Sequence, residues 1–223
     1  MKSLKGKTAL ITGAGKEIGR AVAIALAQEG VNICLLSRAN LSLEAFAKEI
    51  KSYGVKASIA TAEATDIHEI IVAVEKLEEE VGVIDIFINS EEAATFSPFF
   101  EFDPIQWELN LKANLLGLNY LTRAILPSMV KNKTGDIINI STTLHPRSMI
   151  HHDALNTSQT SYSFLSESLM EEVNSHNIRF SALSTTWSEE EGFAEESISL
   201  ADDFPQYLIA HLRGNPVQVS MGL

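Results

Sequence analysis

The feature that most constrains the fold of this chain is an alternation between short apolar runs and longer segments with helical periodicity. The short runs are rich in Ile, Val and Leu, and several are apolar throughout, which is typical of strands buried on both faces of a sheet. We predict about seven strands, at residues 7–12, 31–37, 56–62, 83–89, 136–141, 178–184 and 217–221.

The segments between these runs have the spacing of amphipathic helices. They lie at residues 18–30, 41–54, 66–82, 104–130, 154–175 and 201–213. Glycine readily adopts the left-handed backbone that follows a helix, so four helices are predicted to end at Gly30, Gly54, Gly82 and Gly214. Pro104 suits a first helical turn, whereas Pro127 predicts a kink or break near the end of the longest helix.

Strands that alternate with helices indicate a parallel sheet, because a parallel pair needs a crossover connection. The sequence contains no evident linker, internal repeat or low-complexity tract. We therefore expect an α/β fold in which residues 1–223 form a single domain, a doubly wound parallel sheet flanked by helices. In such a fold a ligand binds beyond the carboxyl ends of the strands, where the strand order reverses.

The composition excludes several classes of partner. The formal net charge of −12 argues against binding to nucleic acid or to an anionic membrane, since both need a basic surface. No apolar run approaches the roughly 18 residues that a membrane span needs, and the first residues reach a glycine turn too early for a signal peptide. The lone cysteine, Cys34, is interpreted as a small buried hydrophobe. These observations predict a soluble, cytoplasmic protein.

The stretch TGAGKEIG, residues 12–19, places a glycine turn between a predicted strand and a predicted helix, which is the setting of a dinucleotide-binding loop. This stretch, together with FINSEEAA, LKANLLGLNYLTRAILPSM, GDIINIST and SLMEEVNSHNIRFSALS, resembles the short-chain dehydrogenase/reductase family over nearly the whole chain. Within that family the chain is similar to bacterial 3-oxoacyl-[acyl-carrier-protein] reductase-like members. The resemblance implies a Rossmann-type fold, an NAD(P)H cofactor and hydride transfer between a carbonyl and an alcohol.

The cofactor turn of the family reads T-G-x-x-x-G-x-G, and Thr12, Gly13 and Gly19 match it. The middle glycine, which lets the backbone approach the pyrophosphate, is replaced by Glu17, whose bulk and charge would oppose that approach. Lys16 beside it would offset part of the negative charge. The turn is therefore either a cofactor site or a purely structural connection between a strand and a helix.

The resemblance also assigns cofactor positions further along the chain. Arg38 stands where NADP-preferring members place a basic residue for the 2′-phosphate, so the cofactor, if any binds, is expected to be NADP(H). Glu63 corresponds to an adenine-contacting aspartate, and Asn89 begins the N-N-A-G motif of the family. Glu91 and Glu92 replace its Ala and Gly. Facing inward, they would oppose a cofactor by crowding and repulsion; facing outward, they would be solvated loop charges.

The catalytic residues of the family are an Asn, a Ser, a Tyr that transfers the proton, and a Lys four residues later that lowers the Tyr pKa. These positions hold Asn114, Thr142, Leu155 and Gln159. Leucine has no proton to donate, and glutamine has no charge. General acid catalysis typically contributes ~10²–10⁴ in rate, so hydride transfer is predicted to be absent or severely weakened.

Replacement acids are few. Tyr162 lies about two helical turns beyond Leu155, with Ser166 following it, and cannot simply substitute. Residues His151, His152 and Asp153 are either a replacement acid/base group or a polar surface segment. Residues 184–186 replace a Pro-Gly-like turn, and the acidic segment 187–204 stands where the family builds its substrate lid.

Three hypotheses of function follow. The chain is a non-catalytic protein of this family, or an active NAD(P)H-dependent carbonyl reductase with a non-standard proton donor, or a scaffold that binds another small-molecule ligand without turnover. The departures from the family pattern concentrate around one cleft, which favours the first. We predict no metal site. The resemblance further implies a homo-oligomer, a dimer or tetramer built from residues 104–130 and 154–175.

Overall fold

The computed structural model describes residues 2–38, 43–93, 98, 100–144, 153–187 and 196–214. The predicted α/β fold is confirmed: six parallel strands form one sheet in the order β3-β2-β1-β4-β5-β6. The strands are β1 (Thr8–Thr12), β2 (Asn32–Ser37), β3 (Ala57–Thr61), β4 (Ile86–Asn89), β5 (Gly135–Leu144) and β6 (Ile178–Trp187). The sheet thus has six described strands rather than about seven, and the predicted strand 217–221 lies outside the described residues.

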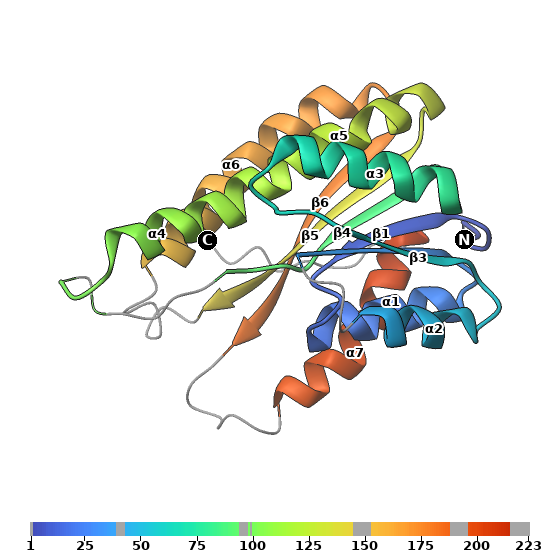
Figure 1. Ribbon diagram of the computed structural model, residues 1–223, viewed down its shortest axis with the longest axis horizontal. Helices are drawn as coiled ribbons and strands as arrows, with labels where there is room; N and C mark the ends of the chain where they lie inside the picture. Colours follow the sequence, from blue (N-terminus) through green and yellow to red (C-terminus); the bar gives the residue numbers. More distant parts are fainter. Residues whose placement is uncertain are drawn as a thin grey trace.

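Helices cover both faces of the sheet (Figure 1). The helices are α1 (Glu17–Gln28), α2 (Leu43–Lys51), α3 (Ile67–Val81), α4 (Pro104–Leu111), α5 (Gly117–Asn132), α6 (Asp153–Asn174) and α7 (Glu196–Leu212). Helices α1, α2 and α7 lie on one face, and α3, α5 and α6 on the other. The four glycines predicted to follow helices all have positive φ, as expected for helix C-termini.

The predicted helix over 104–130 is interrupted earlier than expected. A π-helical turn at Lys112–Leu116 separates α4 from α5, while Pro127 lies inside α5, which continues to Asn132. Of the two alternatives predicted at Pro127, the break is therefore wrong, and the kink stays a prediction. A proline removes one hydrogen bond of the helix, and the buried face of α5, including Leu121 and Ile125, keeps the helix packed on the sheet.

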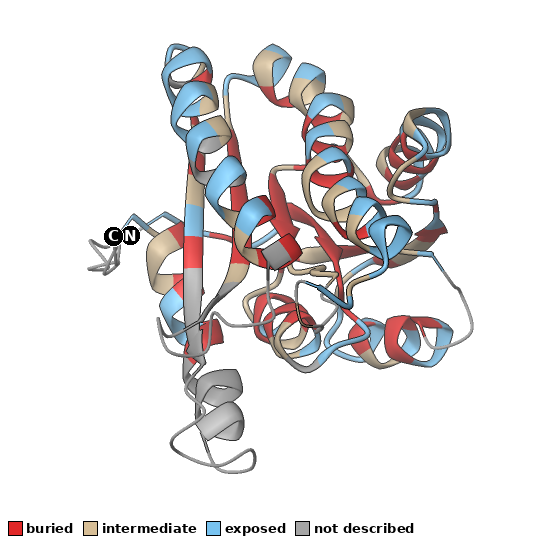
Figure 2. Cartoon of the chain, turned by 90° about the vertical axis from the view of Figure 1, so that its left-hand side faces the viewer, coloured by how far each residue is buried: buried red, intermediate tan, exposed pale blue. Residues whose placement is uncertain are grey.

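The core consists of two apolar clusters, one on each face of the sheet. Successive residues of β1 enter opposite clusters: Ile11 packs with α1, α2 and α7, and Leu10 packs with α3 and α5. Figure 2 shows the buried residues along the strands and on the inward sides of the helices. Cys34 is fully buried, as predicted, and burial, with Glu78 and Glu80 nearby, raises its thiol pKa to about 12.

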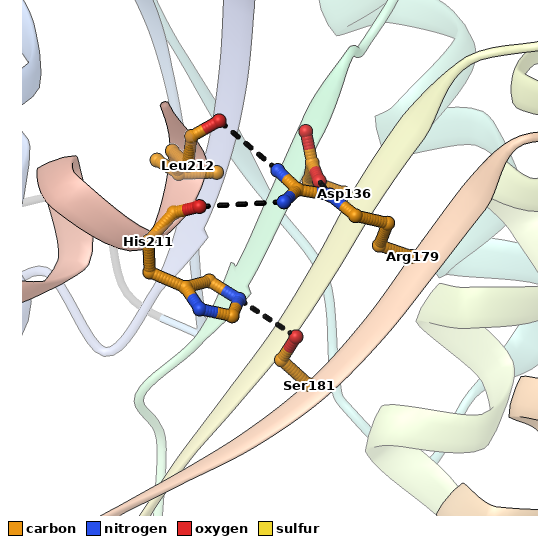
Figure 3. Close-up of polar contacts among 5 residues, drawn as sticks. All are labelled: Asp136, Arg179, Ser181, His211 and Leu212. Atoms are coloured by element: carbon orange, nitrogen blue, oxygen red, sulfur yellow. Dashed lines mark hydrogen bonds and ion pairs between the residues drawn. The ribbon is translucent and has the colours of Figure 1, made fainter. Parts of the chain in front are cut away.

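The end of α7 is anchored at the amino edge of the sheet by a set of residues that we call the amino-edge cluster: Asp136, Arg179, Ser181, His211 and Leu212 (Figure 3). Arg179 Nε donates to Asp136 Oδ1 at 2.6 Å, and Asp136 and Arg179 are register partners near the starts of β5 and β6. The two Nη atoms of Arg179 donate to the carbonyls of His211 and Leu212 at 3.3 and 3.0 Å. Ser181 Oγ lies 2.8 Å from His211 Nε2.

The described part of the chain contains no helix with the combined length and apolar character that a membrane span requires.

Candidate functional site

The candidate site lies where the strand order reverses, between β1 and β4. Thr12 and Asn89, the last residues of these strands, are register partners at the carboxyl edge of the sheet. A cleft of about 530 Å³, counting its open mouth, begins there. Its lining includes Thr12, Lys16, Arg38, Glu63, Asn89 and Asn114. Six of the residues predicted from sequence are thus brought together at the position where this fold binds ligands.

The glycine turn is shaped by its contact with Ser90, the residue after β4. Gly13 has a φ of +68°, and a Cβ on it would lie 2.6 Å from the Ser90 carbonyl oxygen. A Cβ on Gly19 would lie 2.5 Å from both the Gly13 carbonyl oxygen and Ser90 Oγ. Ser90 Oγ also donates a hydrogen bond of 2.7 Å to the Thr12 carbonyl. The fold therefore requires both glycines for packing, whether or not a cofactor binds. Ser90 was not among the predicted site residues.

Glu17 is the first residue of α1, with Lys16 as the N-cap residue. An acidic residue at this position interacts favourably with the helix dipole, at the place where a bound phosphate would otherwise do so. The Glu17 side chain lies outside the described part of the structure. Its predicted effect on a cofactor therefore stays a prediction.

Three buried side chains link the ends of β1, β4 and β5. Thr12 Oγ1 donates to Asn89 Oδ1 at 2.7 Å, and Asn89 Nδ2 donates to Asn139 Oδ1 at 2.7 Å. All three residues are buried. Asn139 was not among the residues predicted from the sequence. Its contact with Asn89 follows from the register of β4 and β5, which places the two residues opposite each other. The side chains of Thr12 and Asn89 thus form hydrogen bonds between strands beneath the cleft.

The two cationic side chains at the cleft contact the residues that follow β4. Lys16 Nζ donates to the carbonyl oxygen of Glu92 at 2.8 Å. Arg38 Nε lies 3.8 Å from Glu91 Oε1, with side-chain exposures of 67% for Arg38 and 30% for Glu91. Glu91 and Glu92 both line the cleft. Glu91 and Glu92 therefore face the cleft rather than standing outward as solvated loop charges.

Asn114 lies in the π-helical turn, a feature that is frequent at functional sites. Its Oδ1 accepts from the Ala93 N–H at 2.8 Å, and its Nδ2 donates to the Ala93 carbonyl at 2.9 Å. The same Nδ2 lies 3.1 Å from Ser158 Oγ, which donates to the Leu155 carbonyl at 2.8 Å. Asn114 thus brackets the backbone of Ala93 and links it to the start of α6.

Leu155 and Gln159 lie one turn apart on α6. Leu155 is buried, with 3% of its surface exposed. Gln159 lines a smaller hollow of about 300 Å³ beside the cleft, together with Asn139 and Ser158. Its Nε2 donates to Glu92 Oε1 at 2.8 Å. The amide therefore contacts the chain's own carboxylate at the position where the family places a lysine.

Other predicted positions lie in less complete parts of the structure. Thr142 pairs in register with Thr185 between β5 and β6, but the side chains of both residues lie outside the described part. The same holds for the side chains of Asp153, Tyr162 and Ser166, and for all of residues 145–152 and 188–195. Within the described residues no group of three or more His, Cys, Asp or Glu is placed to hold a metal ion.

The residues that line the cleft do not fit an NADP(H) dinucleotide in this arrangement. Lys16 and Arg38, the side chains suited to its phosphates, contact Glu92 and Glu91 instead. Glu91 and Glu92 also line the cleft, and negative charges at short range oppose the binding of an anionic dinucleotide.

The order of the strands, the glycine turn and the cleft at the switch point are typical of the α/β folds that bind dinucleotides. Comparison with known proteins makes the assignment specific. A sequence model of the short chain dehydrogenase family matches residues 7–195, and the chain belongs to this family.

Individual relatives agree. The chain is 31% identical over 210 residues to a short chain dehydrogenase of Pseudocercospora fijiensis, covering 91% of this chain and 66% of that protein. It is 28% identical over 218 residues to the 3-oxoacyl-[acyl-carrier-protein] reductase FabG of Aquifex aeolicus, covering 97% and 88%. A metagenomic short-chain oxidoreductase solved in complex with NADP superimposes with a TM-score of 0.82 at 27% identity, covering 96% and 93%. The chain spans only 61% and 53% of the length of two further curated oxidoreductases.

Proposed function

We propose that this chain keeps the fold of a short-chain reductase of the 3-oxoacyl type and has lost, or nearly lost, hydride transfer. The observation that carries the proposal is the pair of residues at the Tyr and Lys positions. Leu155 is buried and has no proton to give, and the Gln159 amide is bonded to Glu92.

The chemistry of carbonyl reduction supports this reading. The carbonyl oxygen must receive a proton as the hydride arrives, and a positioned acid typically contributes ~10²–10⁴ in rate. The Ser158 hydroxyl, one helical turn from Leu155, donates to the Leu155 carbonyl. A serine hydroxyl without an adjacent base is a poor acid at neutral pH.

The role that we propose is therefore a binding, regulatory or structural one, exercised through the cleft. If the cleft takes a cofactor, the basic side chains of Lys16 and Arg38 favour NADP(H) over NAD(H). The metagenomic relative bound to NADP supports this choice of nucleotide. A different small molecule in the same cleft is the alternative ligand.

A homo-oligomer is part of the proposal. Helices α4 and α6 expose large apolar side chains, namely Ile105, Leu109, Phe164 and Met170. Helices α4 and α6 are in contact with one another, and exposed apolar side chains on adjacent helices are candidates for a protein–protein contact. We expect a dimer or tetramer through these helices. Sedimentation equilibrium tests this, and a strictly monomeric chain at micromolar concentration would refute it.

The catalytic proposal is tested by assaying reduction of an acetoacetyl thioester by the wild-type chain with NADPH and with NADH. The expected result is no turnover above the buffer blank, with an active 3-oxoacyl reductase as the positive control. Turnover within about tenfold of the control would refute the proposal, because the missing acid alone is expected to reduce the rate by ~10² or more.

A further inference from the structure

Four side chains from four different parts of the fold converge on three consecutive residues of the chain. Lys16 comes from the glycine turn, Arg38 follows β2, Asn114 comes from the π-helical turn and Gln159 from α6. The resemblance to the family assigns Arg38 to the cofactor and Asn114 and Gln159 to catalysis, and Lys16 lies within the glycine turn of the cofactor motif. Their contacts are with residues 91–93, directly after β4.

The contacts match donors with acceptors. The Glu91 carboxylate faces the Arg38 guanidinium, and the Glu92 carboxylate accepts from the Gln159 amide. The backbone takes part as well: the Glu92 carbonyl accepts from Lys16, and Ala93 is held at both its N–H and its carbonyl by Asn114.

The segment is fixed at its start. Ser90 donates to the Thr12 carbonyl at 2.7 Å and fills the space that side chains on Gly13 and Gly19 would need. The chain therefore enters the cleft in contact with the glycine turn itself. Glu91, Glu92 and Ala93 follow as half-buried lining of the cleft.

We propose that residues 90–93 are an intramolecular occupant of the dinucleotide path, which competes with NADP(H) for Lys16 and Arg38 and so sets a low affinity of the cleft for that nucleotide. The inference deepens the function proposed above and rests on it, because it concerns the same cleft. Weak binding of NADP(H) is thereby due to residues 90–93 and not to a loss of cationic side chains, since Lys16 and Arg38 are still present.

The experiment compares NADPH binding, by calorimetry, to the wild type and to two double variants. Glu91→Ala with Glu92→Ala removes both carboxylates and their contacts with Arg38 and Gln159, while the contact of Lys16 with the Glu92 backbone carbonyl stays. Glu171→Ala with Glu172→Ala removes the same charge from exposed positions of α6, away from the cleft. We expect at least tenfold tighter NADPH binding in the first variant and a change of less than about twofold in the second, since distant exposed charges are screened.

Two results would overturn the inference: an unchanged dissociation constant in the cleft variant, or an equal gain in both variants, which would indicate a general effect of net charge. If the alanine variant does not fold, Glu91→Gln with Glu92→Gln keeps the side-chain volume and removes the charge. At least threefold tighter binding is then expected, and no change overturns the inference. Turnover of the thioester by the wild type would refute the proposed function instead, and the binding comparison does not depend on it.

Discussion

Charged side chains lie at both the amino edge and the carboxyl edge of the sheet, where the strands begin and end, and they differ in how far they are buried. At the amino edge Arg179 is partly buried, 35% exposed at its side chain, against an Asp136 side chain that is 10% exposed. It also satisfies the last carbonyls of α7. At the carboxyl edge Arg38 is 67% exposed and contacts Glu91 at 3.8 Å.

The difference in exposure indicates that the Arg179 ion pair stabilises the fold, whereas the Arg38 ion pair can be exchanged for another partner. A partly buried cation that donates to a buried acid and to helix carbonyls is costly to remove, because the acid stays buried without its donor. An exposed ion pair contributes about 0–1 kcal/mol and is readily exchanged for another partner. The amino edge therefore maintains the fold, whereas the carboxyl edge retains the properties of a ligand site.

The largest effect is expected for Arg179→Ala. The change removes the Arg179 donor from Asp136 and from the Leu212 carbonyl, while the His211 carbonyl keeps the Gly214 N–H, so we expect a loss of about 2–4 kcal/mol in the free energy of unfolding. Urea denaturation measures it. Lys112→Ala, which removes the exposed pair with Glu108, is the control and should change stability by less than about 0.5 kcal/mol. Equal effects of the two changes would remove the distinction between the edges.

The next effect concerns the glycine turn. Gly13→Ala places a Cβ against the Ser90 carbonyl at a φ of +68°, so a loss of about 2–3 kcal/mol is expected from overpacking and backbone strain. Gly15→Ala is the matched control, because nothing lies within 4 Å of its Cβ and its φ is not left-handed. Thermal unfolding of both variants measures the difference. A Gly13→Ala protein as stable as the Gly15→Ala protein would contradict the structural role of Gly13.

A smaller effect is expected for Glu91→Ala with Glu92→Ala, this time on stability. The contacts that it removes are exposed or half-buried, so the free energy of unfolding should change by no more than about 1 kcal/mol. Urea denaturation beside Arg179→Ala gives the comparison directly. A loss as large as that of Arg179→Ala would mean that the segment after β4 is part of the structural scaffold.

The smallest effect is a pH dependence at the amino edge. Burial, and then the nearby Arg179, lower the pKa of His211 below its ordinary value of 6.5, with Asp136 opposing. The unfolded chain thus binds the proton more readily. The stability from neutral His211 is complete above pH 6.5 and is lost as the pH falls through the folded pKa. Unfolding at pH 7.5 and 5.5 should show a larger decrease for the wild type than for His211→Gln; equal decreases would exclude His211 as the cause.

Much of the fold follows from local patterns in the sequence. The apolar strands and the glycines after helices are local signals, and counting along the family motif locates Asn114, Leu155 and Gln159 without a structure. Partners across the cleft are not local. Which way Glu91 and Glu92 face, and that Lys16 contacts the Glu92 carbonyl, depend on the path of the loop after β4. The π-helical turn was missed because Lys112–Leu116 reads as an ordinary helix, and Ser90 because its role is contact with Gly13 and Gly19.

The most direct test of the account is a single-turnover measurement of NADPH oxidation by an acetoacetyl thioester in the Glu91→Ala, Glu92→Ala protein. With the two carboxylates removed, we predict that NADPH binds and is not oxidised above the buffer blank. Adding Leu155→Tyr and Gln159→Lys in the same protein should then raise the rate by at least ~10², the share of a general acid. Rapid oxidation before those two residues are restored would contradict the claim that the chemistry is lost at Leu155 and Gln159.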